Sequence, residues 1–322
     1  MKEQRSGIPP TLVTPPFDRL VPLFYFQIFS HPLNFQELHL FSQSTIKDVA
    51  DFERSLEQMV NDGLLFKKDN YYLLEDKQEW INQRMENEQR ASLYLKKTEK
   101  IVHLMRRFPF VEAIFLSGSA SKGVVSEGGD IDYFIITQPE RLWITRTLLI
   151  LFKKIFLFNS HRYFCINYLI DTNHLEIEEK NRFTATEITT LLPVFQTPYY
   201  KVFLEANNWT KAYYPNSKIK KPLIAYTMPK SKIKTFAEYI LNGKLGEWLD
   251  IWTMQLSIKH WKKKFNAMEV KHFNVALKSR PYVSKHHPQN FQNKVMEGFK
   301  KNIASFEKKH GFKFDNKDLY KG

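Results

Sequence analysis

Two short apolar runs, separated by a polar stretch, dominate residues 110–137. The first run, 110–117, leads directly into Gly118-Ser119, and the second follows the motif Asp130-Ile131-Asp132. Apolar runs of this length, rich in β-branched and aromatic residues and bounded by glycine or polar residues, predict β-strands. The segment therefore predicts a strand, a glycine-containing turn and a second strand that opens with two carboxylates.

The two aspartates of this motif are candidate metal ligands. Alternate side chains of an extended strand share a face, so Asp130 and Asp132 project together while Ile131 and Tyr133 point the other way. Magnesium takes hard oxygen ligands, usually one or two carboxylates plus waters and substrate phosphates. Asp130 and Asp132 are therefore expected to hold a nucleotide-bound Mg²⁺ or Mn²⁺. The structural alternative is a pair of acids at a turn and strand edge.

The turn between the runs carries residues suited to phosphate. Gly118 allows a backbone to approach phosphates closely, and Ser119 offers a hydroxyl and a backbone N–H to phosphate oxygens. Lys122 adds a positive charge, and Gly123 permits the chain to turn back. We therefore expect Gly118, Ser119 and Lys122 to bind nucleotide.

Taken together, the Gly-Ser turn, the ten-residue gap and the Asp-x-Asp strand resemble the signature of the DNA polymerase beta-like nucleotidyltransferase superfamily. The resemblance covers about residues 110–171. It implies transfer of a nucleoside monophosphate from a nucleoside triphosphate, with release of pyrophosphate. It also implies catalytic roles for Asp130 and Asp132.

Members of this superfamily usually place a third carboxylate on a later strand, where it binds a second metal or activates the attacking hydroxyl. The next strand candidate is 163–171, and its middle residue is Asn167. An amide oxygen can coordinate metal but cannot serve as a general base. Asn167 is the expected structural counterpart, and Asp171, on the same face, is the nearest acid that could substitute.

Residues 20–75 read as three helices and a hairpin. Asn34 can cap a short helix that ends near Phe41, a third helix spans 48–61, and a polar turn joins two short strands within 64–74. The arrangement resembles a winged helix-turn-helix. The third helix offers Arg54 against four acidic residues, which favours a structural or docking role over sequence-specific DNA binding.

The remaining segments read as helices. One or two long helices are expected over 76–107, and a helix capped by Thr137 is expected over 140–158. Further helices are expected at 184–192, 199–208, 232–241, 245–264 and 288–310. Their aromatic residues are expected in the core: Trp248, Trp252, Phe291, Phe299 and Phe306. Arg280 and His286 have a spacing seen in helical ribonucleases, but Pro281 argues against a shared helix.

These segments predict an α+β protein, with a mixed-sheet nucleotidyltransferase core flanked by an N-terminal winged-helix unit and a helical C-terminal region. The predicted boundaries are 1–75 for the winged-helix unit, 76–108 for a helical linker, 109–200 for the core and 201–322 for a basic helical domain.

Charge is distributed unevenly along the 322 residues. Residues 211–322 hold 24 Lys+Arg against 8 Asp+Glu, whereas residues 1–210 hold 24 against 26. Such a basic region attracts nucleic acid or other polyanions, and it is equally typical of a lysine-rich solvated surface.

The sequence contains no apolar stretch long enough to predict a membrane span or a signal peptide, so a cytoplasmic location is expected. The single cysteine, Cys165, is expected to be a small buried residue.

Two functions therefore stand against each other. The first is a metal-dependent nucleotidyltransferase that acts on an unidentified acceptor hydroxyl. The second is a catalytically weak nucleotide-binding regulator that uses the winged-helix unit to dock DNA or protein. An acid beside the metal favours the enzyme, and its absence favours the regulator. A plain transcription factor does not explain the Gly-Ser to Asp-x-Asp spacing.

Overall fold

A six-stranded mixed sheet positions the predicted motif. In the computed structural model, the described residues are 15–315 except 159, 161, 195–196, 225–230, 288–290 and 312. The strand order is β7-β4-β5-β6-β9-β8. The bounds are β4 Val111–Ser117, β5 Asp132–Thr137, β6 Cys165–Asp171, β7 Leu192–Pro193, β8 Ser279–Arg280 and β9 Val283–Lys285. Strands β5 and β6 run parallel, and the other neighbouring pairs are antiparallel. The predicted α+β class with a mixed sheet is confirmed.

Helix α5, Leu142–Phe156, makes the crossover between the two parallel strands. The prediction that Thr137 caps this helix was wrong, because Thr137 is still part of β5 and pairs with Val111. Glu140 adopts a left-handed backbone with φ of 58°, which delays the helix start. A distant residue caps the helix instead: Oδ1 of Asp250 accepts a hydrogen bond from the Ile144 N–H at 2.8 Å.

The N-terminal unit contains the three predicted helices and hairpin. Its elements are α1 Phe17–Phe26, η1 Gln27–Phe29, β1 Leu33–Asn34, α2 Phe35–Phe41, α3 Val49–Asn61, β2 Phe66–Lys68 and β3 Tyr71–Leu73. The three strands form an antiparallel sheet in the order β1-β3-β2. Asn34 caps α2 as predicted, in a reciprocal capping box with Glu37. This box satisfies two backbone N–H groups that the first helical turn leaves without partners.

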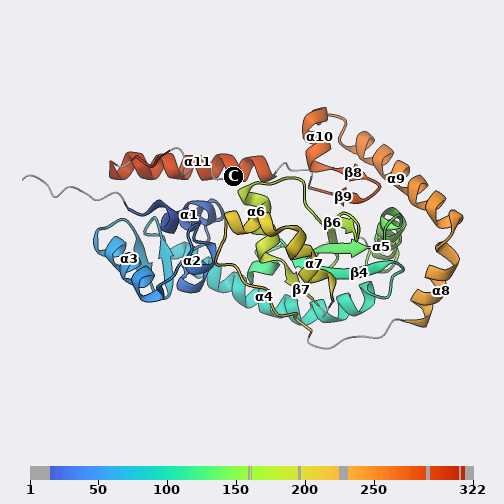
Figure 1. Cartoon of the computed structure of the whole chain (residues 1–322), viewed down its shortest axis with the longest axis horizontal. Coiled ribbons are helices and arrows are strands. Elements are labelled where there is room, and N and C mark those ends of the chain that lie inside the picture. The colour runs from blue at the N-terminus through green and yellow to red at the C-terminus, as the bar shows by residue number, and fades with distance from the viewer. Residues whose placement is uncertain are drawn as a thin grey trace, which may run out of the picture.

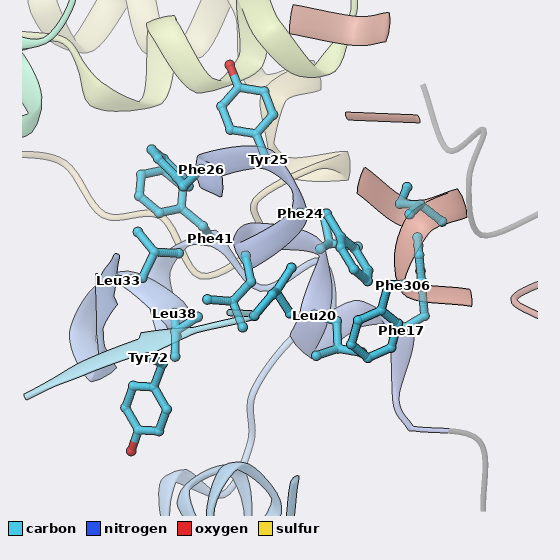
Figure 2. Packing of buried hydrophobic residues seen from close by; sticks show 14 of the residues in the cluster. Phe17, Leu20, Phe24, Tyr25, Phe26, Leu33, Leu38, Phe41, Tyr72 and Phe306 are labelled. Atoms are coloured by element: carbon cyan, nitrogen blue, oxygen red, sulfur yellow. The ribbon is translucent and has the colours of Figure 1, made fainter. Parts of the chain in front are cut away.

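The two ends of the chain share one hydrophobic core. Helix α11, Phe291–His310, packs along α1 (Figure 1). Figure 2 shows Phe306 of α11 beside Phe17 and Phe24 of α1, and the Phe24 and Phe306 rings lie 5.2 Å apart, edge to face. Phe299 is buried in the same core. The C-terminal third therefore contributes to the N-terminal core through α11 and to the central sheet through β8 and β9.

A single helix, α4, Gln78–Met105, runs beneath both parts of the molecule (Figure 1). Its Arg84 is buried, and its guanidinium binds both carboxylate oxygens of Glu37 at 2.8 Å and one oxygen of Glu88 at 2.8 Å. Bidentate pairs of this kind fix geometry as well as adding energy. The Arg84–Glu37 ion pair therefore connects α4 to the capping box of α2.

Helices cover the sheet and the edge of the molecule. They are η2 Ala120–Lys122, α6 Arg182–Thr190, α7 Tyr199–Ala206, η3 Asn208–Ala212, α8 Lys232–Leu241, α9 Lys244–Lys264 and α10 Val270–Ala276.

Three aromatic residues that were expected in the core are exposed: Trp248 by 59%, Trp252 by 46% and Phe291 by 43%. Trp248 and Trp252 stack on one another at the outer edge instead, with ring centroids 6.0 Å apart. No helix in the described part of the chain combines the length and hydropathy that a membrane crossing requires.

Candidate metal centre and its cavity

The sheet brings two aspartates and a cysteine together at one end of β5 and β6. Asp132, the first residue of β5, pairs with Ser117 of β4 on one side and Cys165 of β6 on the other. One ligand atom from each of Asp130, Asp132 and Cys165 lies within 4.8 Å of the other two. Two carboxylate oxygens and a thiol at this spacing can hold a divalent metal ion.

The glycine that follows β4 makes room for this cluster. Gly118 has a φ of 63°, which an L-residue rarely adopts. A Cβ built there would overlap Oδ2 of Asp132 and lie 3.3 Å from its Cγ. Gly118 is therefore required both by the backbone conformation and by the close approach of the Asp132 carboxylate.

Asn167 lies beside Asp132, where a third acid was expected. The β5–β6 pairing is irregular between Tyr133 and Phe134, which are opposite Ile166 and Tyr168. Asn167 is skipped in this ladder, and its side-chain amide donates a hydrogen bond to Oδ1 of Asp132. The amide therefore stabilises a charged Asp132 and adds no negative charge to the cluster.

Asp171 lies at the other end of the same strand. It pairs with Thr137, five residues beyond Asp132 along β5, which at about 3.3 Å per residue is roughly 16 Å away. Its Oδ1 accepts a hydrogen bond from the Asn173 N–H at 3.0 Å and is 2.7 Å from Nδ1 of His174. The structure does not bring Asp171 to the acidic cluster, because residues four apart on a strand share a face but lie about 13 Å apart along it.

Asp132 and Cys165 hold their protons more tightly than ordinary carboxyl and thiol groups do. Burial and the neighbouring Asp130 carboxylate raise the pKa of Asp132 to about 7. Burial, followed by the two aspartates, raises the pKa of the Cys165 thiol well above its usual range. The Cys165 Sγ lies 3.3 Å from Oδ1 of Asn167 and 9% of the residue is exposed. Excess negative charge of this kind is what a bound cation relieves.

A cavity of about 830 Å³ opens over the cluster and separates the sheet from the N-terminal unit. Gly118, Ser119 and Lys122 line it, as do Asp130, Asp132 and Asn167. Lys122 Nζ donates to the Gly118 carbonyl at 3.0 Å and pairs with Glu187 of α6 at 2.8 Å. Six of the seven predicted site residues therefore face one cavity, and Asp171 is not among its lining residues.

The opposite wall is basic and aromatic. Arg146 and Lys153 of α5 line it with His286 and His287, which follow β9. Burial lowers the pKa of both histidines to about 4, so they are neutral at pH 7. Aromatic rings close the cavity from the N-terminal unit and α11, where Phe29 and Phe291 lie 5.9 Å apart.

Sequence reasoning missed several of these residues. Cys165 carried a weak signal, because it opens the strand that contains Asn167. Glu187 and Arg146 carried none, because they belong to helices that reach the cavity only through tertiary packing. The spacing between Arg280 and His286 indicated a ribonuclease motif and not a place in this cavity. Searches against protein-family models, curated proteins and solved structures found no significant match for this chain.

Proposed function

We propose that this chain is a metal-dependent nucleotidyltransferase that transfers a nucleoside monophosphate from a nucleoside triphosphate to an acceptor hydroxyl. One observation carries the proposal: Asp130 and Asp132 converge beside the Gly118-Ser119 turn at the floor of a large cavity. Hard carboxylate oxygens next to a phosphate-sized turn suit a nucleotide-bound Mg²⁺ or Mn²⁺.

The residues present fit such a metal. Asp130 and Asp132 would supply carboxylate oxygens. The amide oxygen of Asn167 hydrogen-bonds with the thiol of Cys165, the third residue of the cluster, and would supply a neutral oxygen ligand. When bound, the metal neutralises the charge that develops on the phosphates and helps to align the acceptor with the α-phosphorus. The charge on Asp132, which burial opposes, then has a counterion.

The nucleotide occupies the cavity with its phosphates toward the turn. Ser119 is exposed to the cavity and offers its hydroxyl, while Lys122 supplies a positive charge whose position is fixed by Glu187. The base lies against the aromatic wall, where Phe29 and Phe291 offer π-faces that suit any base. Base preference would therefore come from polar contacts at its edge.

The transfer forms a bond between the acceptor oxygen and the α-phosphorus and breaks the bond to the pyrophosphate oxygen. The acceptor hydroxyl loses a proton in this step, and Asn167 cannot take it because an amide is not a general base. Among the described residues that line the cavity, the carboxylates are Asp130, Asp132 and Glu187. Glu187 is paired with Lys122, which faces the nucleotide phosphates, so once the aspartates hold the metal the proton passes to a basic group of the substrates themselves.

The second candidate is a nucleotide-binding regulator, and Asn167 is the observation that favours it. An amide at this position weakens the acidic cluster that catalysis needs. The exposed side of α3 carries acidic residues and its Arg54 lies 3.7 Å from Asp51, so this helix suits a protein partner better than DNA. The basic region 211–322, which includes the lysines at 262–264 of α9, remains the predicted surface for nucleic acid or another polyanion.

Labelling with each of the four α-labelled nucleoside triphosphates, with Mg²⁺ or Mn²⁺ and co-purified material as acceptor, tests the proposal. Label should be lost in Asp130→Asn and Asp132→Asn. It should persist in Asp171→Asn, which removes a buried carboxylate from the far end of the same strand. Metal-dependent nucleotide binding without labelling would support the regulator, and the absence of both would refute the site.

A further inference from the structure

The cavity contains a buried cation without an acidic partner. Arg146 is 8% exposed and lines the wall formed by α5. Within the described part of the chain, its Nε has no hydrogen-bond partner and the guanidinium forms no ion pair. Burial lowers its pKa to about 10, which still leaves it charged at pH 7. A buried charge normally requires a partner, because its removal from water is strongly unfavourable.

Nearby rings compensate for only part of this cost. The guanidinium carbon lies 4.7 Å from the ring centroid of Trp261 and 5.8 Å from that of Trp143. Cation–π contacts of this kind are favourable but weak compared with the cost of desolvating a charge. They hold the guanidinium in place but supply no acceptor for its N–H groups.

A second cation and two imidazoles adjoin Arg146. Lys153 is on the same face of α5, two turns further on, and only 4% of it is exposed. His286 packs against Trp261 with ring centroids 5.2 Å apart, and His287 lines the same cavity. The neutral imidazoles can donate or accept hydrogen bonds without adding charge. Together these side chains offer the paired N–H donors of a guanidinium, the compact charge of an ammonium and the neutral polar groups of two imidazoles.

We propose that Arg146 and Lys153 bind a phosphate group of the acceptor, so that the proposed transferase acts on a phosphorylated molecule. This assignment rests on the proposed function. Guanidinium groups bind phosphate through paired N–H donors, and a lysine ammonium adds a compact charge. The anion supplies the partner that Arg146 lacks.

The position of this pair separates it from the nucleotide phosphates. Lys122 belongs to the turn after β4 and is held by Glu187, whereas Arg146 and Lys153 belong to α5. Lys153, Asp130 and Cys165 all line the same cavity, so the acidic cluster faces this wall as well as the Gly118 turn. A metal-bound α-phosphate would then lie between the two basic groups. At about 830 Å³, the cavity is at the large end of typical ligand pockets and can admit two substrates.

Inorganic phosphate, added without metal or nucleotide, tests the binding site. Adjacent lysines provide a matched pair, because Lys153 is buried in the cavity wall and Lys154 is exposed. We expect phosphate affinity to fall by roughly tenfold or more in Arg146→Met and Lys153→Met, and by less than about twofold in Lys154→Met. Equal affinity in all four proteins would overturn the site.

Thermal stability separates a binding role from a structural one. Removing an unpaired buried charge should leave the melting temperature of Arg146→Met unchanged or higher when no phosphate is present. A lower melting temperature together with an unchanged phosphate response would assign Arg146 to the core and overturn the inference. If Arg146→Met does not fold, Lys153→Met against Lys154→Met decides the question.

Competition identifies the source of the phosphate. With saturating nucleoside triphosphate and Mg²⁺ present, phosphate should still bind if the site belongs to the acceptor. Displacement by nucleotide would assign Arg146 and Lys153 to the triphosphate tail and overturn the acceptor assignment. Phosphate binding that depends on Arg146 in a protein without transferase activity would refute the proposed function and leave an anion site in place.

Discussion

The side-chain amide of Asn167 donates a hydrogen bond to Oδ1 of Asp132 across the parallel strands β5 and β6. A carboxylate in the position of Asn167 would face Asp132 and repel it. The amide thus lets two aspartates and a buried thiol coexist without metal, at the cost of a third anionic ligand. Metal affinity and metal-free stability are therefore opposed at this residue.

The variant Asn167→Asp should separate these two properties. Without metal at pH 8 it should lose about 1–3 kcal/mol of stability, since a hydrogen bond is replaced by repulsion between buried carboxylates. Its Mn²⁺ affinity should rise by roughly tenfold, because the site gains a charged oxygen ligand. Denaturant unfolding in EDTA and Mn²⁺ titration calorimetry measure the two effects. Asn167→Ala is the control, and unchanged Mn²⁺ affinity in Asn167→Asp would contradict the assignment.

Gly118→Ala and Gly123→Ala form a matched pair. Both glycines have positive φ, 63° and 76°, but only at Gly118 would a Cβ meet Asp132, and nothing lies within 4 Å at Gly123. Gly123→Ala should cost about 1–2 kcal/mol of stability from backbone strain alone and leave metal binding intact. Gly118→Ala should cost more and should weaken Mn²⁺ and nucleotide binding, as calorimetry would show. Equal effects in the two variants would mean that Asp132 does not depend on this close approach.

The thiol of Cys165 in the acidic cluster predicts that thiophilic metals inhibit the labelling reaction selectively. Mg²⁺ does not favour sulfur, whereas Zn²⁺ and Cd²⁺ bind thiolates strongly and can displace the thiol proton. Low concentrations of Cd²⁺ should therefore inhibit labelling in the natural protein and lose potency by roughly tenfold or more in Cys165→Ser. Mg²⁺-dependent labelling should survive the substitution. Equal Cd²⁺ sensitivity in both proteins would place the inhibitory ion elsewhere.

Asp250 predicts a pH-dependent contribution to stability. It caps α5 through Ile144, yet burial raises its pKa to about 6 from an ordinary 3.8. Folding thus favours the protonated acid, and this contribution is fully present below about pH 3.8 and is lost as the pH rises through 6. Asp250→Asn keeps an acceptor and cannot titrate, so its stability relative to the natural protein should rise between pH 4 and 7, by up to roughly 3 kcal/mol.

Denaturant midpoints measured across that range test this expectation. Asp250→Ala, which also removes the cap, should be less stable than Asp250→Asn by about 1 kcal/mol at every pH. A difference between Asp250→Asn and the natural protein that stays constant from pH 4 to 7 would contradict a raised pKa for Asp250.

Sequence patterns predicted those elements that short-range interactions determine. The Asn34 cap, the hairpin and the two strands around Gly118 follow from short-range preferences, and all are present. The start of α5 was placed too early, because the Glu140 backbone and the distant cap Asp250 determine it. The core position of Trp248 was wrong, since helical spacing shows that residues share a face but not what that face contacts.

In the candidate site too, local patterns predicted some of the geometry and tertiary packing determines the rest. Asp130 and Asp132 are two residues apart in the sequence, but β5 begins at Asp132, so the loop that precedes the strand, and not the strand alone, places Asp130 beside Asp132. Asn167 reaches Asp132 only through an irregularity in the pairing of β5 with β6, which no residue pattern indicated. Arg146 and Glu187 belong to different helices, and only the tertiary packing brings them to the same cavity.

The most direct test of nucleotidyl transfer uses two labels on one nucleotide. Parallel reactions with α-labelled and γ-labelled triphosphate, in Mg²⁺, should place the α label in an acceptor product and release the γ label as pyrophosphate, in equal amounts. Both signals should disappear in Asp132→Asn. Incorporation of the γ label, or α labelling that persists in Asp132→Asn, would contradict the central claim that the Asp130–Asp132 centre transfers a nucleoside monophosphate.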